Sequence, residues 1–208
     1  MTSIKYKITE FFIIFILVPL SFTLEFSAYI KMGMGLVGFV YVIYVLLKVE
    51  HEVFKMAPNL NWSHFIKITA AKLVIIAIIT FLYVWFTNKE VLFAVLLNKP
   101  LLWGVILFVY TFLSVYPQEL IYRTFFFKRY SVFFKDKNLL LFINAIVFAL
   151  AHMLFRNTLV LILTFLGGLL FAFTFQNTKS TLLVSIEHAL YGCWLFTVGM
   201  GAMLGFPA

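Results

Sequence analysis

Seven long apolar runs dominate this sequence and limit its fold more than any other feature. They lie near residues 8–24, 33–47, 68–87, 101–116, 139–155, 158–175 and 181–204. Each comes near the roughly 20 residues that an α-helix needs to cross the hydrocarbon core of a bilayer. Lipid cannot hydrogen-bond the backbone, so such spans must be helices. The sequence therefore predicts an all-α, polytopic membrane helix bundle.

A less apolar stretch, 118–134, raises the expected count to about seven to eight transmembrane helices. Pro117 is expected to begin it, because a proline in the first turn of a helix costs no hydrogen bond. This stretch either lies on the membrane surface or forms an eighth helix, and the depths argued below favour the eighth helix. The sequence shows no internal repeat, linker or second domain, so we expect a single membrane domain over residues 1–208.

The composition excludes a soluble protein, since 64% of the residues are hydrophobic against roughly 45–50% in soluble chains. The formal net charge of +8 would suggest nucleic-acid binding in a soluble domain. Here the basic residues stand between the apolar runs, as Lys48, Lys89 and Lys128 do, and are expected to face lipid headgroups. We therefore predict membrane lipids as partners and no nucleic acid. As a separate expectation, the membrane is taken to be the bacterial cytoplasmic membrane.

Several ionisable side chains stand inside the apolar segments, and five of them are notable. They are Glu119, Arg123, His152, Glu187 and His188. Burying such groups in a membrane is costly, so their default interpretation is functional. Glu10 is nearer a helix end and is expected at the interface, and Lys72 is expected to reach the headgroups.

The spacing of these residues indicates their depth. If residues 135–138 join two antiparallel helices, Glu119 and His152 both lie about 23–26 Å from that loop. His188 lies about 15 Å beyond the turn at 176–180, and tilt could close the difference. One carboxylate and two imidazoles can thus converge. Arg123 follows Glu119 by four residues and shares its helical face, whereas Glu187 points about 100° away from His188.

Two other interpretations of this set remain. The groups could make structural hydrogen bonds between helices. Alternatively, Glu119, His152 and His188 could bind a divalent metal such as zinc across the helices. The sequence has no HExxH, which argues against a zincin site. Gly167 and Gly168 lie in an apolar run and are expected where two helices pack closely.

The same residues resemble the motifs of a membrane protease family. Residues 118–123, QELIYR, resemble EExxxR; residues 148–152, FALAH, match FxxxH; and residues 188–192, HALYG, resemble HxxxN. In this order they are typical of the CPBP family, the CAAX proteases and bacteriocin-processing proteins also called Abi. The resemblance covers a core of about 115–195.

The resemblance implies an intramembrane endopeptidase that hydrolyses a membrane-associated or lipidated peptide. In the family, the first glutamate and the FxxxH histidine activate water, while the last histidine and asparagine stabilise the oxyanion. This implies catalytic roles for Glu119, His152 and His188, with Gln118 and Arg123 in support.

Two positions depart from the family pattern. Gln118 replaces the first glutamate, and Gly192 replaces the asparagine. An amide cannot take up a proton near neutral pH, and glycine has no side-chain donor. Either Glu119 acts as the base, or the chain is a weak or inactive relative that serves as a membrane scaffold, immunity or binding protein.

Overall fold

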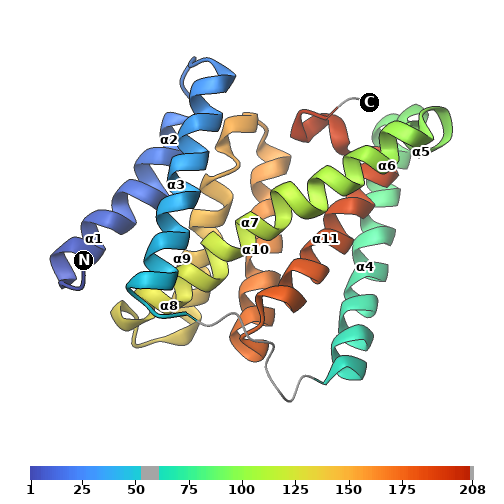
Figure 1. The fold of residues 1–208 in the computed structure, drawn as a ribbon. Coiled ribbons are helices and arrows are strands. Elements are labelled where there is room, and N and C mark those ends of the chain that lie inside the picture. Colours follow the sequence, from blue (N-terminus) through green and yellow to red (C-terminus); the bar gives the residue numbers. More distant parts are fainter. Residues whose placement is uncertain (53–60, 207–208) are drawn as a thin grey trace. The chain divides into compact units, whose positions relative to one another are not determined.

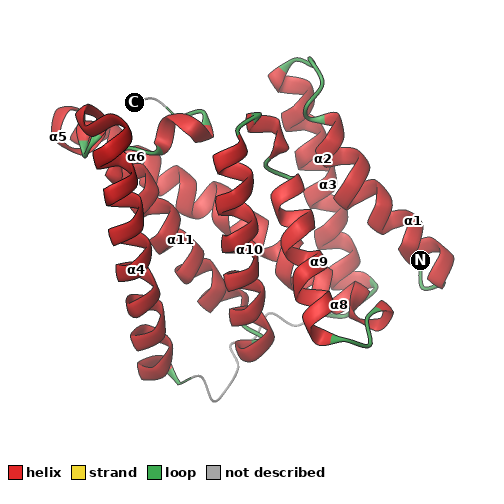
Figure 2. Ribbon diagram, turned by 180° about the vertical axis from the view of Figure 1, so that it is seen from behind, coloured by secondary structure: helices red, strands yellow, loops and turns green. Residues whose placement is uncertain are grey.

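The computed structural model describes residues 1–52 and 61–206, and these residues form helices joined by short loops, with no strand among them (Figures 1 and 2). The helices are α1 (Ile4–Phe12), α2 (Val18–Ser21), α3 (Ala28–Lys48), α4 (Trp62–Asn88), α5 (Ala94–Asn98), α6 (Pro100–Val109), α7 (Tyr116–Glu119), α8 (Phe126–Tyr130), α9 (Lys137–Leu150), α10 (Thr158–Thr178) and α11 (Thr181–Val198). Wider π-helical turns join α1 to α2, α6 to α7 and α7 to α8.

Six continuous helices in this part of the chain are long and apolar enough to cross a membrane. They are Ala28–Lys48, Trp62–Val91, Pro100–Phe133, Lys137–Phe155, Thr158–Thr178 and Thr181–Val198. The predicted all-α membrane architecture is therefore confirmed, with six spans by length and composition.

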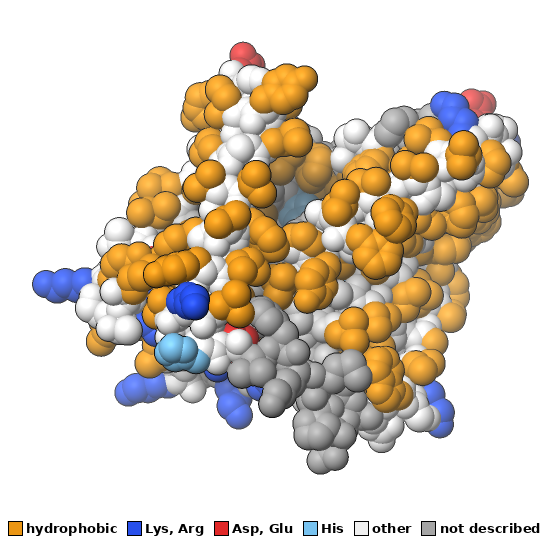
Figure 3. Space-filling model, viewed as in Figure 1, with side chains coloured by type: hydrophobic (Ala, Val, Ile, Leu, Met, Phe, Trp, Pro, Cys, Tyr) orange, Lys and Arg blue, Asp and Glu red, His pale blue; other side chains and the backbone are white. Residues whose placement is uncertain are grey.

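The surface fits a lipid environment. Tyr29, Phe86 and Leu101 are 85%, 80% and 84% exposed, an arrangement that water would disfavour and acyl chains would not. Figure 3 shows hydrophobic side chains over most of the visible face, with lysines and arginines toward its margins.

The predicted helix start at Pro117 is wrong, because one helix runs from Pro100 to Phe133. A proline inside a helix lacks an N–H and crowds the carbonyl four residues earlier. Here π-helical turns, Tyr110–Val115 and Leu120–Phe125, flank it on both sides. Such local adjustments allow a membrane helix to continue through proline. The sequence segments 101–116 and 118–134 thus belong to one span.

The chain divides into two compact units. The first comprises Met1–Lys55 and Pro117–Asn177, and the second comprises Met56–Tyr116 and Thr178–Ala208. The single domain expected from the sequence stays a prediction.

An aromatic core fastens the N-terminal segment of the first unit onto α8 and the turn before it. Phe15 is fully buried, and its ring lies 5.4–5.7 Å from those of Tyr122, Phe126 and Tyr130, each approached edge to face. Such pairs contribute beyond their buried area. The helix that carries Glu119 and Arg123 is thereby braced on one side.

Helices α9 and α10 approach closely at a glycine. A Cβ added at Gly168 would lie 3.0 Å from the Ala145 Cα, whereas at Gly167 it would meet only the side chain of Phe171. The expected close-packing point is confirmed for Gly168, and it brings α10 against the helix that leads to His152.

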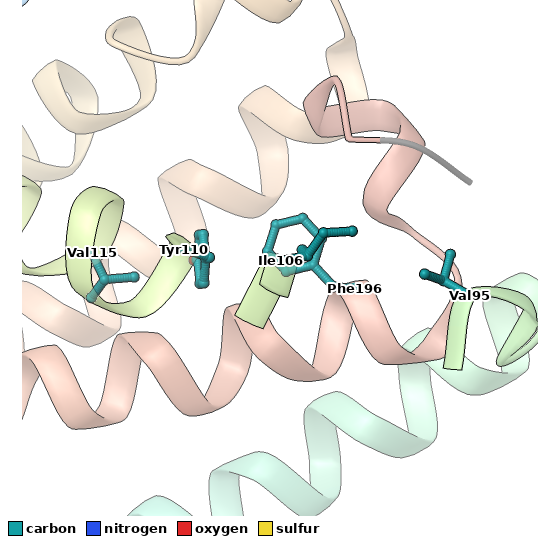
Figure 4. Close-up of a cluster of buried hydrophobic side chains, with 5 residues drawn as sticks. All are labelled: Val95, Ile106, Tyr110, Val115 and Phe196. Atoms are coloured by element: carbon teal, nitrogen blue, oxygen red, sulfur yellow. The ribbon is translucent and has the colours of Figure 1, made fainter. Parts of the chain in front are cut away.

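In the second unit, an apolar cluster joins α5, α6, the turn Tyr110–Val115 and α11. Its buried members are Val95, Ile106, Tyr110, Val115 and Phe196 (Figure 4). The cluster holds Tyr110 against α11, the helix that carries His188.

Candidate active site

A buried polar network of the first unit is built on the ion pair predicted between Glu119 and Arg123. Arg123 Nε lies 3.2 Å from Glu119 Oε2, and both side chains are fully buried. The two residues stand one helical turn apart, so the chain presents them on one face. A buried carboxylate needs such a partner to remain charged. The predicted pairing is confirmed.

Helix α9 fixes the far end of the guanidinium. Arg123 Nη1 donates to Asn144 Oδ1 at 2.6 Å, and Asn144 Nδ2 donates to the Tyr122 carbonyl at 2.6 Å. The guanidinium carbon also lies 4.7 Å from the ring centre of Phe148. These contacts from two directions hold Arg123 in one orientation, and through it the carboxylate of Glu119.

Sequence reasoning missed Asn144. It stands alone as an amide in the apolar run 139–155, four residues before Phe148 and eight before His152. This helical spacing to two motif residues is the signal that could have identified it.

His152 lies just beyond the end of α9. Its Nδ1 is 2.8 Å from the Phe148 carbonyl, and its ring centre is 4.8 Å from that of Phe148. A carbonyl can only accept, so this contact places a proton on Nδ1, and in a neutral ring Nε2 is then the acceptor nitrogen. This tautomer suits a group that takes a proton from water.

The structure thus brings Glu119, Arg123 and His152 into one cluster of the first unit. Phe148 links them, since its ring contacts both the Arg123 guanidinium and the His152 imidazole. Gln118 also lies in this unit, beside Glu119 and half-buried.

His188 lies in the second unit, on α11, and is 6% exposed. The ring of Tyr110 approaches its imidazole edge to face, with 6.0 Å between the centroids. Gly192 follows one turn later and is also buried. His188 is therefore set in an aromatic, water-poor environment.

Glu187 takes part in a separate network, as the helical geometry predicted. Its Oε1 lies 2.8 Å from Lys72 Nζ and accepts from Tyr191 Oη at 2.9 Å, and Tyr191 also donates to the Thr69 carbonyl. Lys72 was expected to reach the headgroups, but it points inward to this carboxylate. A buried charge attracts a flexible cation more strongly than water-exposed lipid does.

No three histidine, cysteine, aspartate or glutamate side chains form a metal-binding group among residues 1–52 and 61–206. Glu119 instead faces a guanidinium. The divalent metal considered for Glu119, His152 and His188 stays a prediction, and no step below is routed through it.

Comparison with models of known protein families gives a match over the region that contains these residues. The family model described as type II CAAX prenyl endopeptidase Rce1-like matches residues 99–194. The match runs from the start of α6 into α11 and includes every motif residue of both units. It confirms the CPBP resemblance. No curated protein and no solved structure matches the chain.

Proposed function

We propose that the chain is an intramembrane endopeptidase, because over residues 99–194 it belongs to the Rce1-like type II CAAX prenyl endopeptidase family. Its substrate is a membrane-associated or lipidated peptide. Water activated by Glu119 and His152 attacks the scissile carbonyl, and His188 stabilises the resulting oxyanion. The proposal rests most on the buried network that orients Glu119 through Arg123 and Asn144.

The network suits proton transfer. The Glu119 carboxylate is fully buried and held in one orientation, and a positioned carboxylate is a common general base. Its ion pair keeps one oxygen against Arg123 Nε. His152, with Nε2 as acceptor, can take the second proton and pass it to the leaving amine. Gln118 can donate and accept hydrogen bonds but cannot act as the base.

The experiment measures cleavage in detergent micelles. The panel contains peptides ending in a farnesylated or geranylgeranylated cysteine and the same peptides unmodified, with products identified by mass spectrometry. We expect wild type to cut at least one peptide, and the Glu119→Gln/His152→Gln double variant to cut none although it remains folded at the assay temperature. A preference between the two peptide series reports the contribution of the lipid.

Two other outcomes would contradict parts of this proposal. A folded wild-type protein that cuts nothing supports a non-enzymatic scaffold, immunity or binding role, which Gln118 and Gly192 favour. Cleavage that survives in the double variant contradicts the assignment of Glu119 and His152.

We also propose that the protein resides in the bacterial cytoplasmic membrane. Besides the six long apolar helices, we propose that residues 4–21 make a seventh crossing. This continuous helix reaches about 27 Å, close to the hydrocarbon thickness of a bilayer. Single cysteines replacing Thr2 and Glu25, both exposed, are introduced beside Cys193→Ala. A membrane-impermeant thiol reagent should label them from opposite sides. Labelling of both from one side would show that this helix lies on the surface.

A further inference from the structure

The space for a side chain at residue 192 is already occupied. A Cβ built on Gly192 would stand 1.9 Å from Tyr110 Oη and 2.3 Å from Tyr110 Cε1 and Cζ. Contacts below 3.0 Å do not occur between real atoms of this kind. The phenol of Tyr110 therefore fills the volume that any larger residue at 192 would need, and its hydroxyl is the group nearest the missing Cβ.

This places the hydroxyl on the face of α11 that carries His188. Residues 188 and 192 are one turn apart, so their side-chain positions lie on the same face. The ring of Tyr110 lies perpendicular to the His188 imidazole, and Tyr110 is 9% exposed. An O–H and an imidazole thus stand together on one buried face within the second unit.

The phenol is also held firmly. Tyr110 packs edge to face on Phe196, with 4.8 Å between centroids, and Figure 4 shows it between Val115 and Ile106 along its helix. It is the first residue of the π-helical turn Tyr110–Val115, and such turns frequently occur at functional sites. A donor fixed among apolar groups stabilises a developing anion without having to reorganise.

We propose that Tyr110 Oη is a hydrogen-bond donor to the oxyanion, beside His188 and in the place of a side chain at 192. The inference rests on the endopeptidase function proposed above. When water adds to the scissile carbonyl, its oxygen takes the electron pair of the C=O π bond. Tyr110 donates a hydrogen bond to that oxygen and keeps its proton. When the C–N bond breaks, the pair returns to re-form the carbonyl, so the hydroxyl is unchanged.

The first test is Tyr110→Phe, which keeps the ring and removes only the hydroxyl. Loss of one oxyanion donor lowers kcat by about 10²–10³-fold, and we expect KM to change by less than about threefold because the ground-state carbonyl gains little from the donor. The matched control is Tyr191→Phe on α11, whose hydroxyl binds Glu187 and the Thr69 carbonyl. The control should retain kcat within about threefold.

The second test moves the hydrogen-bond donor from residue 110 to residue 192. Gly192→Asn alone should lose activity and melt earlier, because its Cβ meets Tyr110. Tyr110→Ala with Gly192→Asn restores both room and a donor, and it should exceed the kcat of Tyr110→Ala by at least about tenfold. This rescue separates a donor role from a packing role if Tyr110→Phe also lowers the melting temperature.

The outcomes separate the two proposals. Wild-type cleavage with an unchanged kcat in Tyr110→Phe overturns the role of Tyr110 and leaves the endopeptidase function standing. A drop in kcat in Tyr110→Phe without rescue in the Tyr110→Ala/Gly192→Asn double variant also overturns the role of Tyr110. A folded wild type that cuts no peptide overturns the endopeptidase function, and the role of Tyr110 with it.

Discussion

The Glu119→Gln protein is expected to cleave its best peptide about 10²–10⁴-fold more slowly than wild type, the usual range for losing a general base. KM should change little, since the carboxylate acts on water rather than on the bound peptide. Glutamine has nearly the same shape, so the helix packing is kept. The measurement is kcat and KM in micelles, with the melting temperature recorded beside them.

Stability must be followed because Arg123 loses its anion. The guanidinium is fully buried 3.2 Å from Glu119, and it also contacts Asn144, the Tyr122 carbonyl and two aromatic rings, all of them uncharged. Removing one partner of a buried ion pair leaves a charge without compensation. Assays are therefore run well below the lowest melting temperature of the series.

Residue 118 supplies the control for this prediction. Gln118→Glu restores the family glutamate, and in the Glu119→Gln background it should recover less than about tenfold. Neighbouring residues on a helix point about 100° apart, and Arg123 faces position 119. Gln118→Ala tests the supporting role of the amide by itself. Recovery to the wild-type rate would contradict this assignment and make position 118 the natural place of the base.

The Arg129→Ala protein is expected to lose about 3–5 kcal/mol of unfolding free energy, the usual cost of breaking a buried ion pair. Arg129 is fully buried on α8 and donates to the Glu10 carboxylate, to Glu50 Oε1 at 2.6 Å and to the Met1 carbonyl at 2.7 Å. Glu10 also accepts from Tyr41 and Tyr130. Without Arg129, this carboxylate remains buried, and its partners within residues 1–52 and 61–206 are the two hydroxyls.

Its neighbour provides a matched control. Lys128 precedes Arg129 in the chain and pairs with Glu52 at 2.9 Å, but its side chain is 44% exposed. Exposed pairs contribute about 0–1 kcal/mol, so Lys128→Ala should melt within a few degrees of wild type. Unfolding is followed by far-UV circular dichroism during titration of mixed micelles with SDS. Equal midpoints for the two variants would contradict the structural role of Arg129.

This cluster adds contacts that the sequence did not predict. Glu10 was expected at the membrane interface, and that position stays a prediction. The structure shows that its carboxylate is buried against protein and joins α1 to α3 and α8. Its partner Arg129 stands 119 residues away. Such a distant partner leaves no periodic mark in a sequence.

The properties that could be predicted from the sequence depend either on residues a few positions apart or on the composition of whole segments. Long apolar runs require helices in lipid whatever their arrangement, so the membrane class followed from composition and run length. The pairing of Glu119 with Arg123 followed from the helical repeat, as did the divergence of Glu187 from His188. Close packing at Gly168 followed from small residues in an apolar run. Each of these predictions used only residues a few positions apart or the composition of one segment.

The remaining features depend on residues brought together from distant segments. Asn144 meets Arg123 across two helices, Lys72 meets Glu187 across 115 residues, and the Tyr110 phenol fills the space over Gly192. The helix also continues through Pro117 because of π-helical turns on both sides, and no sequence pattern predicts these turns. Rotation of each helix about its axis sets these contacts, and it follows from the packing of all neighbouring side chains at once. Helical periodicity therefore predicted which residues share a face, while the folded chain determined what each face meets.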